Sequence, residues 1–320
     1  MKPAQPETPL NCPLTFEPIF MERIWGGRRL ASLFGKKLPA HKRIGESWEI
    51  VDREDAQSVV TVGSLKGLTL HELWMRHRGE IFGEISDAPR FPLLIKLLDA
   101  QEKLSLQVHP PAQVAGRLGA EPKTECWYVA HADPGAELYV GLKQKLSPSG
   151  FRRAIEAGEA ANNVHVIRVA AGDAMLLPSG RIHAIGAGNV LVELQQNSDT
   201  TYRVFDWNRV DDSGKPRRLH VEEALMSINF EDVEPQLSIP EGELLVRSPF
   251  FELQKWQLSR PREIAPVGKF AVVCCLTGNI QCAGVHRGPG EFMLIPAALA
   301  ERMVRPAADG TSILRITMPN

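Results

Sequence analysis

The segment KLSLQVHP, residues 103–110, places three polar side chains on one side of a predicted strand. Ser105, Gln107 and His109 alternate with apolar residues, and alternate residues of an extended chain point to the same face. Two consecutive prolines then end the strand. A hydroxyl, an amide and an imidazole on one face can bind a polar ligand or a metal ion.

Two further segments supply metal-ligating side chains. Glu125 begins the aromatic segment ECWYVAHA, and His183 follows a Pro-Ser-Gly turn. With Gln107 and His109 they offer two imidazoles, a carboxylate and an amide oxygen, which suit zinc or another borderline divalent ion. Neighbouring strands of a barrel can bring such residues into one cavity. Taken singly, a strand histidine beside a proline is more often structural, so the spacing alone does not establish a site.

The elements that must position these residues are mostly strands. Helical patterns occupy residues 68–83, 146–160 and 220–230, and most other segments alternate in short runs. The 26 glycines and 24 prolines are spread along the chain, as turns between short strands require. The pattern predicts a β-sandwich or barrel rather than βαβ units.

A weak internal repeat links residues 168–185 with residues 285–304. In each copy a turn of glycine and an acidic residue precedes an apolar strand, and a proline follows the glycine by six residues. Where the first copy has His183, the second has Glu301. We therefore predict two related β domains, of which the second, smaller one lacks metal ligands. The predicted domains are residues 1–238 and 239–320.

The composition excludes several classes of protein. The chain has 320 residues and a net charge of −1, so it shows no general affinity for nucleic acid or anionic membranes. No apolar run approaches the ~20 residues of a membrane span, and the N-terminal residues lack the apolar core of a signal peptide. Five cysteines without zinc-finger spacing indicate reduced thiols, and we expect a cytoplasmic monomer or homodimer.

Four segments together resemble the type I phosphomannose isomerases, a family of zinc-dependent cupin enzymes. They are LLIKLLDAQEKLSLQVHP, KTECWYV, PSGRIHAIGAG and VELQQNSDTTYRVFDW, and they occur in the family's order. Only fifteen residues separate His109 from Glu125, as in the short bacterial form, which lacks a helical insertion there. IWGG and GESWEI are similar to the family's N-terminal signatures. The resemblance implies a cupin jelly-roll barrel for the metal-binding domain and a degenerate cupin-like second domain.

The resemblance also implies roles for individual residues. One Zn²⁺ per chain is expected on Gln107, His109, Glu125 and His183. Lys96 matches the family's phosphate-binding lysine, and the substrate-binding set is Lys96, Ser105 and Trp25. The expected catalytic residues are Lys123, Glu193, Asp199 and Arg203. The implied reaction interconverts mannose 6-phosphate and fructose 6-phosphate through a cis-enediol.

One position departs from the pattern of the long family members. They have a histidine, assigned to ring opening, just before the lysine that matches Lys123, and this chain has Pro122 there. Ring opening must then use another group or water, or the role belongs to the long form alone. The general base also stays open among Glu193, Asp199 and Lys123.

Three other functions compete with this interpretation. A non-catalytic sugar-phosphate-binding cupin would keep the barrel but lack an intact set of metal ligands and charges, which this chain has. A cupin oxygenase would need open coordination and a redox metal such as iron. A cupin-type glucose 6-phosphate isomerase is closer in chemistry, and a comparison of the two substrates separates it.

Overall fold

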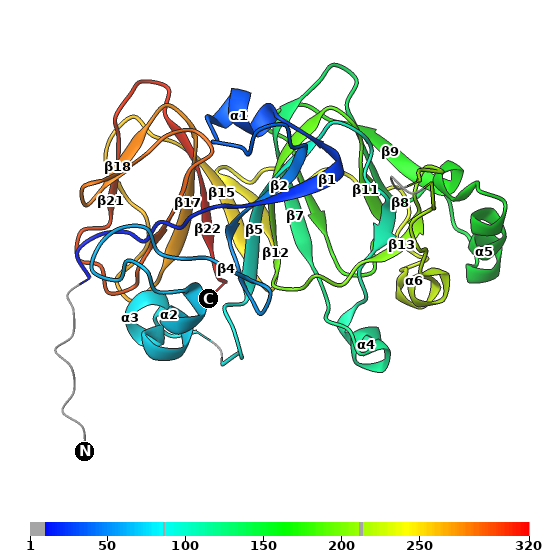
Figure 1. Cartoon of the computed structure of the whole chain (residues 1–320), viewed down its shortest axis with the longest axis horizontal. Helices are drawn as coiled ribbons and strands as arrows, with labels where there is room; N and C mark the ends of the chain where they lie inside the picture. Colours follow the sequence, from blue (N-terminus) through cyan, green and yellow to red (C-terminus); the bar gives the residue numbers. More distant parts are fainter. Residues whose placement is uncertain (1–9, 86, 211–213, 320) are drawn as a thin grey trace.

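A computed structural model describes residues 10–85, 87–210 and 214–319. Most of these residues form antiparallel sheets, and the helices are few and short (Figure 1). The prediction of a mainly β protein is confirmed.

The first lobe contains two sheets that enclose a lumen. The six-stranded sheet has the order β1 (Ile19–Gly27), β2 (Ile44–Ile50), β5 (Leu93–Ala100), β12 (Asn189–Gln196), β7 (Glu125–Ala132) and β10 (Ala174–Leu177). The five-stranded sheet has the order β13 (Tyr202–Phe205), β6 (Leu106–Val108), β11 (His183–Ile185), β8 (Glu137–Leu142) and β9 (Val164–Arg168). A two-stranded sheet joins β3 (Asp52–Arg53) to β4 (Ala56–Gln57).

The second lobe repeats this plan on a smaller scale. One sheet has the order β14 (Leu244–Arg247), β15 (Glu252–Gln257), β22 (Ser312–Thr317), β17 (Ala271–Thr277) and β20 (Phe292–Ile295). The other has the order β16 (Arg262–Glu263), β21 (Met303–Pro306), β18 (Ile280–Cys282) and β19 (Val285–Arg287). The two copies of the sequence repeat lead into β10 and β20, and each is the edge strand of its sheet.

The interior of the second lobe is apolar. Trp256, Cys275 and Met293 belong to its buried core, and Glu301, the counterpart of His183, has a half-exposed side chain paired with Arg305. The domain limits stay a prediction, and some contacts cross them. Leu14, near the N-terminus, forms a bridge with Leu294 of the C-terminal sheet.

The strand β5 shows why the sequence LLIKLLDA is almost continuously apolar. Ile95 and Leu97 pack in a core that also contains Val272 and Leu314 of the second lobe. Lys96 lies on the opposite face, toward the lumen, where it lines a cavity. All eight residues of the strand are buried, because both faces of the sheet are covered. The packing of the two lobes thus fixes the strand that carries Lys96.

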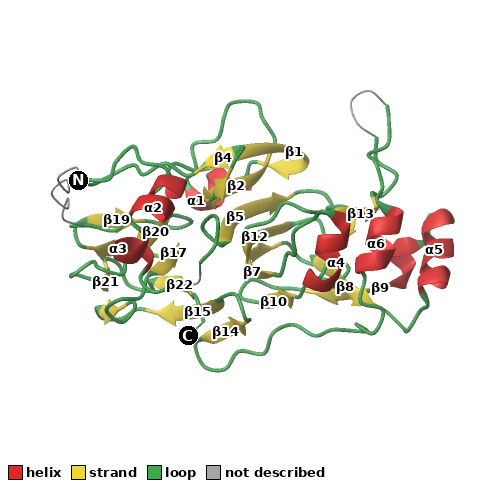
Figure 2. Cartoon of the chain, turned by 90° about the horizontal axis from the view of Figure 1, so that it is seen from below, coloured by secondary structure: helices red, strands yellow, loops and turns green. Residues whose placement is uncertain are grey.

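The helices lie at the periphery (Figures 1 and 2). The predicted helix 68–83 is two helices, α2 (Leu70–Arg76) and α3 (Arg78–Phe82), because His77 between them is not helical. A capping box of Thr69 and Glu72 starts the first. The other two predicted helices are α5 (Pro148–Glu156) and α6 (Val221–Ser227). The sequence did not indicate α1 (Arg29–Phe34), α4 (Ala112–Ala115) or the 3₁₀ turns Gly116–Leu118 and Ala160–Asn163.

Two further predictions concern the state of the cysteines and the presence of a membrane-spanning helix. All five cysteines are free thiols. Within the described ranges, no helix has the length and apolar character that crossing a bilayer requires.

Candidate metal and substrate site

Three neighbouring strands align polar side chains in one row. His183 of β11 pairs with Gln107 of β6, and Gln107 pairs in turn with Arg203 of β13. Residues opposite each other in antiparallel strands project from the same face. The three side chains therefore share one face of the sheet.

The opposite sheet carries a second row. Lys96 of β5 pairs with Trp48 of β2 and with Glu193 of β12, which pairs with Trp127 of β7. The two rows face each other across the lumen. The ring centroids of Trp127, in the second row, and His183, in the first, are only 5.4 Å apart. The site is therefore built between two sheets, from strands far apart in the sequence.

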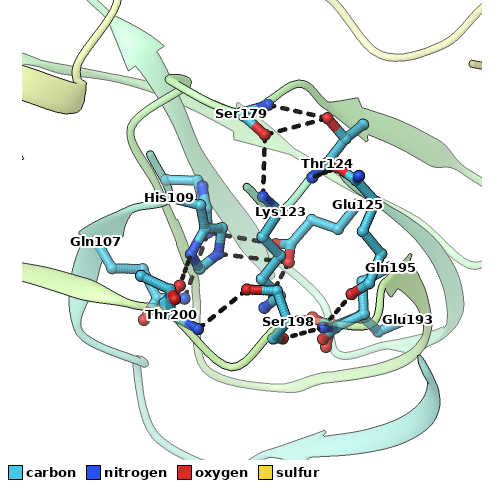
Figure 3. Close-up of polar contacts among 12 residues, drawn as sticks. Gln107, His109, Lys123, Thr124, Glu125, Ser179, Glu193, Gln195, Ser198 and Thr200 are labelled. Atoms are coloured by element: carbon cyan, nitrogen blue, oxygen red, sulfur yellow. Dashed lines mark hydrogen bonds and ion pairs between the residues drawn. The ribbon is translucent and has the colours of Figure 1, made fainter. Parts of the chain in front are cut away.

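A buried His–Glu–His group connects the two sheets: His183 of β11 and His109, just after β6, come from the five-stranded sheet, and Glu125 begins β7 of the six-stranded sheet. Figure 3 shows His109 beside Glu125. The Glu125 carboxylate is 3.4 Å from His109 Nε2 through Oε2 and 3.3 Å from His183 Nε2 through Oε1. Possible ligand atoms of the three residues all lie within 4.8 Å of one another. Among the residues that the structure describes, no other group of His, Cys, Asp and Glu meets this condition.

Backbone contacts orient both imidazoles. His109 Nδ1 lies 2.7 Å from the Thr200 carbonyl oxygen, and His183 Nδ1 lies 2.9 Å from that of Arg181. An Nδ1–H that donates to a carbonyl leaves Nε2 as the ligand atom. His109 Nε2 is buried and has no hydrogen-bond partner in the described chain. These features fit a metal ion, and the Gln107 amide, with Nε2 3.3 Å from His183 Nε2, adjoins the triad.

The protonation states suit metal binding. Burial, with the nearby charge of Lys123, lowers the pKa of His109 to about 4, and burial also lowers the pKa of His183. Burial alone would raise the pKa of Glu125, but Lys123 and His109 hold that pKa well below its usual range. Neutral imidazoles and an ionised carboxylate are the forms that bind a divalent ion.

Lys123 lies between the His–Glu–His group and a neighbouring cavity. Its Nζ is 2.8 Å from Glu125 Oε2, and its backbone N–H donates to Ser179 Oγ at 3.1 Å (Figure 3). Burial works against the charge of Lys123, but attraction to Glu125 and Glu193 is stronger and raises its pKa. The ammonium group is thus held beside the triad.

A cavity of about 410 Å³ opens beside Lys123 and Gln107. Every other predicted catalytic or substrate-binding residue lines it as well: Trp25, Lys96, Ser105, Glu193, Asp199 and Arg203. The cavity also contains three charged residues that sequence reasoning missed, Arg23, Glu46 and Arg217. For Glu46 the sequence holds one indication: the residue alternates with Trp48 in GESWEI, so the two side chains share one face of the strand.

Two predicted substrate-binding residues are already engaged. Lys96 Nζ lies 3.3 Å from Glu193 and 3.9 Å from Glu46, and all three are buried. Ser105 Oγ donates to Gln107 Oε1 at 3.4 Å. Asp199, by contrast, is exposed at the cavity. The role of Lys96 in binding phosphate therefore stays a prediction, and the structure gives this lysine two competing anions.

Glu46 and Glu193 are each fixed by an indole. Trp48 Nε1 donates to Glu46 at 2.6 Å, and Trp127 Nε1 donates to Glu193 at 3.0 Å. Burial would raise the pKa of Glu46, but Lys96 and Arg23 together bring it to about 2. Both carboxylates are therefore preorganised in the cavity wall.

A buried two-histidine, one-carboxylate group between two β-sheets, next to a charged cavity, is typical of metal-dependent enzymes of the cupin class. A family model described as phosphomannose isomerase type I, catalytic domain, matches residues 14–152. The chain is 38% identical to mannose-6-phosphate isomerase ManA of Bacillus subtilis over 90% of this chain and 94% of that protein. It is 42% identical to mannose-6-phosphate isomerase of Streptococcus mutans over 82% and 86% of the two chains.

A solved structure agrees with these relatives. The mannose 6-phosphate isomerase of Bacillus subtilis superposes with a TM-score of 0.85 at 31% identity, over 96% of this chain and all of that one. The chain belongs to the type I phosphomannose isomerase family, and it is an enzyme of that family.

Proposed function

We propose that this enzyme is a Zn²⁺-dependent aldose–ketose isomerase that interconverts mannose 6-phosphate and fructose 6-phosphate through a cis-enediol. The observation that carries the proposal is the placement of the buried His109–Glu125–His183 group beside a cavity lined by Lys123, Glu193 and further charged residues. The names of the relatives support the same substrate pair.

His109, Glu125 and His183 would hold the zinc, with Gln107 as an adjacent amide ligand. A bound divalent ion supplies a Lewis acid that stabilises negative charge on a substrate oxygen. The donor set of two nitrogens and a carboxylate oxygen is one that zinc prefers.

The charged side chains would transfer the proton and stabilise the developing charge. Isomerisation moves a proton between C2 and C1, and this step needs a positioned base and stabilisation of the developing enediolate charge. We assign charge stabilisation to Lys123 and Arg203, which both line the cavity together with Gln107. Glu193, Asp199 and Lys123 are the candidate bases. Since Pro122 replaces the histidine of the long forms, ring opening falls to one of these groups or to water.

The remaining substrate contacts follow from the wall of the cavity. Trp25, Lys96 and Ser105 face the same space and would contact the substrate, with Lys96 at its phosphate and Ser105 at the phosphate or the sugar. We further propose a cytoplasmic location, in keeping with the five free thiols, and a monomeric or homodimeric state.

A single assay tests the proposal. Formation of fructose 6-phosphate from mannose 6-phosphate is measured before chelation, after chelation and after zinc is restored, with glucose 6-phosphate as a parallel substrate. We expect activity on mannose 6-phosphate to disappear with the metal and to return with zinc. A protein that binds the sugar phosphate without turnover in all three states would be a binding protein, and a preference for glucose 6-phosphate would change the substrate.

A further inference from the structure

The indole of Trp127 lies where the two sheets of the first lobe approach each other. The residue belongs to β7, is fully buried, and is part of a core cluster that also contains Val129, Leu138 and Met175. Burial in this cluster explains the apolar part of the indole. It does not explain the Nε1–H group, because a buried indole N–H needs an acceptor inside the protein.

The acceptor is the carboxylate of Glu193, which lies directly opposite Trp127 in the β12–β7 ladder. Trp127 Nε1 donates to Glu193 Oε2 at 3.0 Å, and Lys96 Nζ lies 3.3 Å from the other oxygen, Oε1. The two partners come from β7 and β5, the strands on either side of β12. A carboxylate held at both oxygens by neighbouring strands cannot rotate without breaking a contact.

The same indole also contacts the His–Glu–His group from the opposite sheet. The rings of Trp127 and His183 meet edge to face, with their centroids 5.4 Å apart and their planes at 81°. His183 is held as well by the contact of its Nδ1 with the Arg181 carbonyl oxygen. Trp127 therefore touches a predicted metal ligand through its ring and a cavity carboxylate through its N–H.

The neighbourhood of Glu193 shows what the indole hydrogen bond prevents. Lys96 and Lys123 line the same cavity as Glu193, and Lys96 already lies at Oε1. Without a donor at Oε2, the carboxylate is free to turn both oxygens toward these cations. With the donor in place, each oxygen has a separate partner and keeps a lone pair for a proton of a ligand in the cavity.

We infer that Trp127 is a positioning residue for the reaction: its indole N–H fixes the Glu193 carboxylate, and its packing against His183 fixes that carboxylate relative to the His–Glu–His group. The inference rests on the proposed function, in which Glu193 is a candidate base. Position matters for such a group, since a misplacement of about 1 Å can cost ~10²-fold in rate. The described lining of the cavity does not include Trp127, so this residue acts through Glu193.

The first experiment is a double-mutant cycle of turnover in the zinc-loaded enzyme. Trp127→Phe keeps an aromatic ring beside His183 but removes the N–H donor. We expect it to lower kcat for mannose 6-phosphate by about 10- to 100-fold, as the loss of a group that orients a site residue does, and to change KM by less than about 3-fold. When Glu193 is already glutamine, the same substitution should lower kcat no further, because residues that act as a unit are not additive.

Three results of this cycle would contradict the inference. Unchanged kcat in Trp127→Phe would show that the donor is not needed. Equal losses with and without Glu193 would show that Trp127 acts through packing alone. Near-normal turnover in Glu193→Gln would mean that the reaction does not use the carboxylate that Trp127 holds.

Trp256→Phe is the matched control for the loss of an indole. Trp256 is a buried residue of the second lobe, and its Nε1 donates to Gln254 at 2.9 Å. Both substitutions remove the same atoms and one hydrogen bond, so we expect similar decreases in the melting temperature. Trp256→Phe should keep the wild-type kcat, and both variants should keep the wild-type zinc content by elemental analysis. An equal loss of kcat in Trp256→Phe would reduce the effect of Trp127→Phe to general destabilisation and refute the inference.

The second experiment observes the contact without turnover and without the Trp127→Phe variant. The chain has six tryptophans, and the NMR signal of the Trp127 indole N–H is assigned through its nuclear Overhauser effects to His183. Glu193→Gln replaces a charge-assisted hydrogen bond by a weaker neutral one. We therefore expect the Trp127 signal to move upfield and its proton to exchange faster with solvent. An unmoved signal in a folded Glu193→Gln protein would overturn the inference.

The proposed function and the role of Trp127 can fail separately. A wild type whose Trp127 signal responds to Glu193→Gln, but which forms no fructose 6-phosphate, would contradict the function and support the contact that positions Glu193. An active wild type in which Trp127→Phe keeps full turnover would support the function and contradict the positioning role.

Discussion

Lys96 and Glu193 face each other across the β5–β12 ladder, with Nζ and Oε1 3.3 Å apart and side chains only 6% and 5% exposed. Each charge is buried and depends on the other. Removing Lys96 leaves the buried charge of Glu193 without a cation, and removing Glu193 leaves Lys96 with the more distant Glu46 alone, at 3.9 Å. The stability of the barrel therefore depends on an ion pair that also forms part of the cavity wall.

This coupling is measurable by a double-mutant cycle. Lys96→Met and Glu193→Gln should each lower the free energy of unfolding by roughly 3 kcal/mol or more, because each strands a buried group. The double variant should be more stable than the sum of the two losses predicts, by about 0.5–3 kcal/mol. Urea unfolding of the four proteins checks this. Strictly additive losses would mean that the two side chains do not interact energetically.

Glu193→Gln also tests catalysis. The substitution keeps the shape of the side chain but removes its charge, so a general base at this position would be lost. We expect turnover to fall by ~10²- to 10⁴-fold while the zinc content stays at the wild-type level. Glu102→Gln, which changes a half-exposed carboxylate outside the cavity, is the control and should keep normal turnover. Near-normal turnover in Glu193→Gln would leave Asp199 and Lys123 as the candidate bases.

The pKa of Glu46 predicts how stability depends on pH. In the folded protein Lys96 and Arg23 overcome the effect of burial and lower this pKa to about 2, whereas an unfolded glutamate titrates near 4.3. The folded state therefore gains stability above pH ~5, of roughly 3 kcal/mol, and loses it as the pH falls toward 2.

Comparison with Glu46→Gln isolates this contribution. The variant lacks the titrating group, so its deficit in unfolding free energy should be largest above pH ~5 and should shrink as the solution is acidified. Chemical unfolding at several pH values measures the difference. A deficit that stays constant down to pH ~3 would show that Glu46 is not held ionised by its neighbours.

His183→Ala should lose both metal and activity. His183 supplies one of the two buried imidazoles, and its Nδ1 contact with the Arg181 carbonyl aims the other nitrogen at Glu125. We expect zinc below one tenth of the wild-type content after dialysis, and isomerase activity reduced at least in proportion. Elemental analysis provides a readout independent of turnover. A fully metallated His183→Ala protein would reject this residue as a ligand.

The sequence predicted the members of the site better than their arrangement. Alternation within a strand shows which side chains share a face, so Ser105, Gln107 and His109 could be grouped from the sequence alone. It does not show which strands are neighbours, and the row from His183 to Arg203 depends on strand pairing. The resemblance to a family, rather than spacing, brought His183 and Glu125 together with His109.

Some residues left little or no signal in the sequence. Arg217 lies beyond β13 outside any regular element, where no periodicity indicates a direction. Every residue of β2 is buried, so its sequence does not reveal which face Glu46 occupies relative to the core. The helix over residues 68–83 was predicted as one, because the apolar spacing continues across the break at His77.

The two N-terminal signatures, IWGG and GESWEI, have a physical explanation that yields a last prediction. A Cβ added at Gly26 would lie 2.3 Å from the backbone nitrogen of Gly45, and one added at Gly45 would meet the side chains of Arg23 and Trp25. The strands β1 and β2 therefore approach closely only because both positions are glycine. This approach places Trp25 in the cavity wall.

Gly26→Ala should push these strands apart. We expect a loss of about 1–3 kcal/mol in unfolding free energy, as overpacking against backbone atoms produces, and a higher KM for mannose 6-phosphate because Trp25 moves. Gly79→Ala is the matched control, since a Cβ there meets no atom within 4 Å and the helical position should gain up to ~1 kcal/mol. Thermal unfolding and steady-state kinetics of both variants decide the matter: equal stability in the two proteins would mean that β1 and β2 tolerate a wider separation than their glycines indicate.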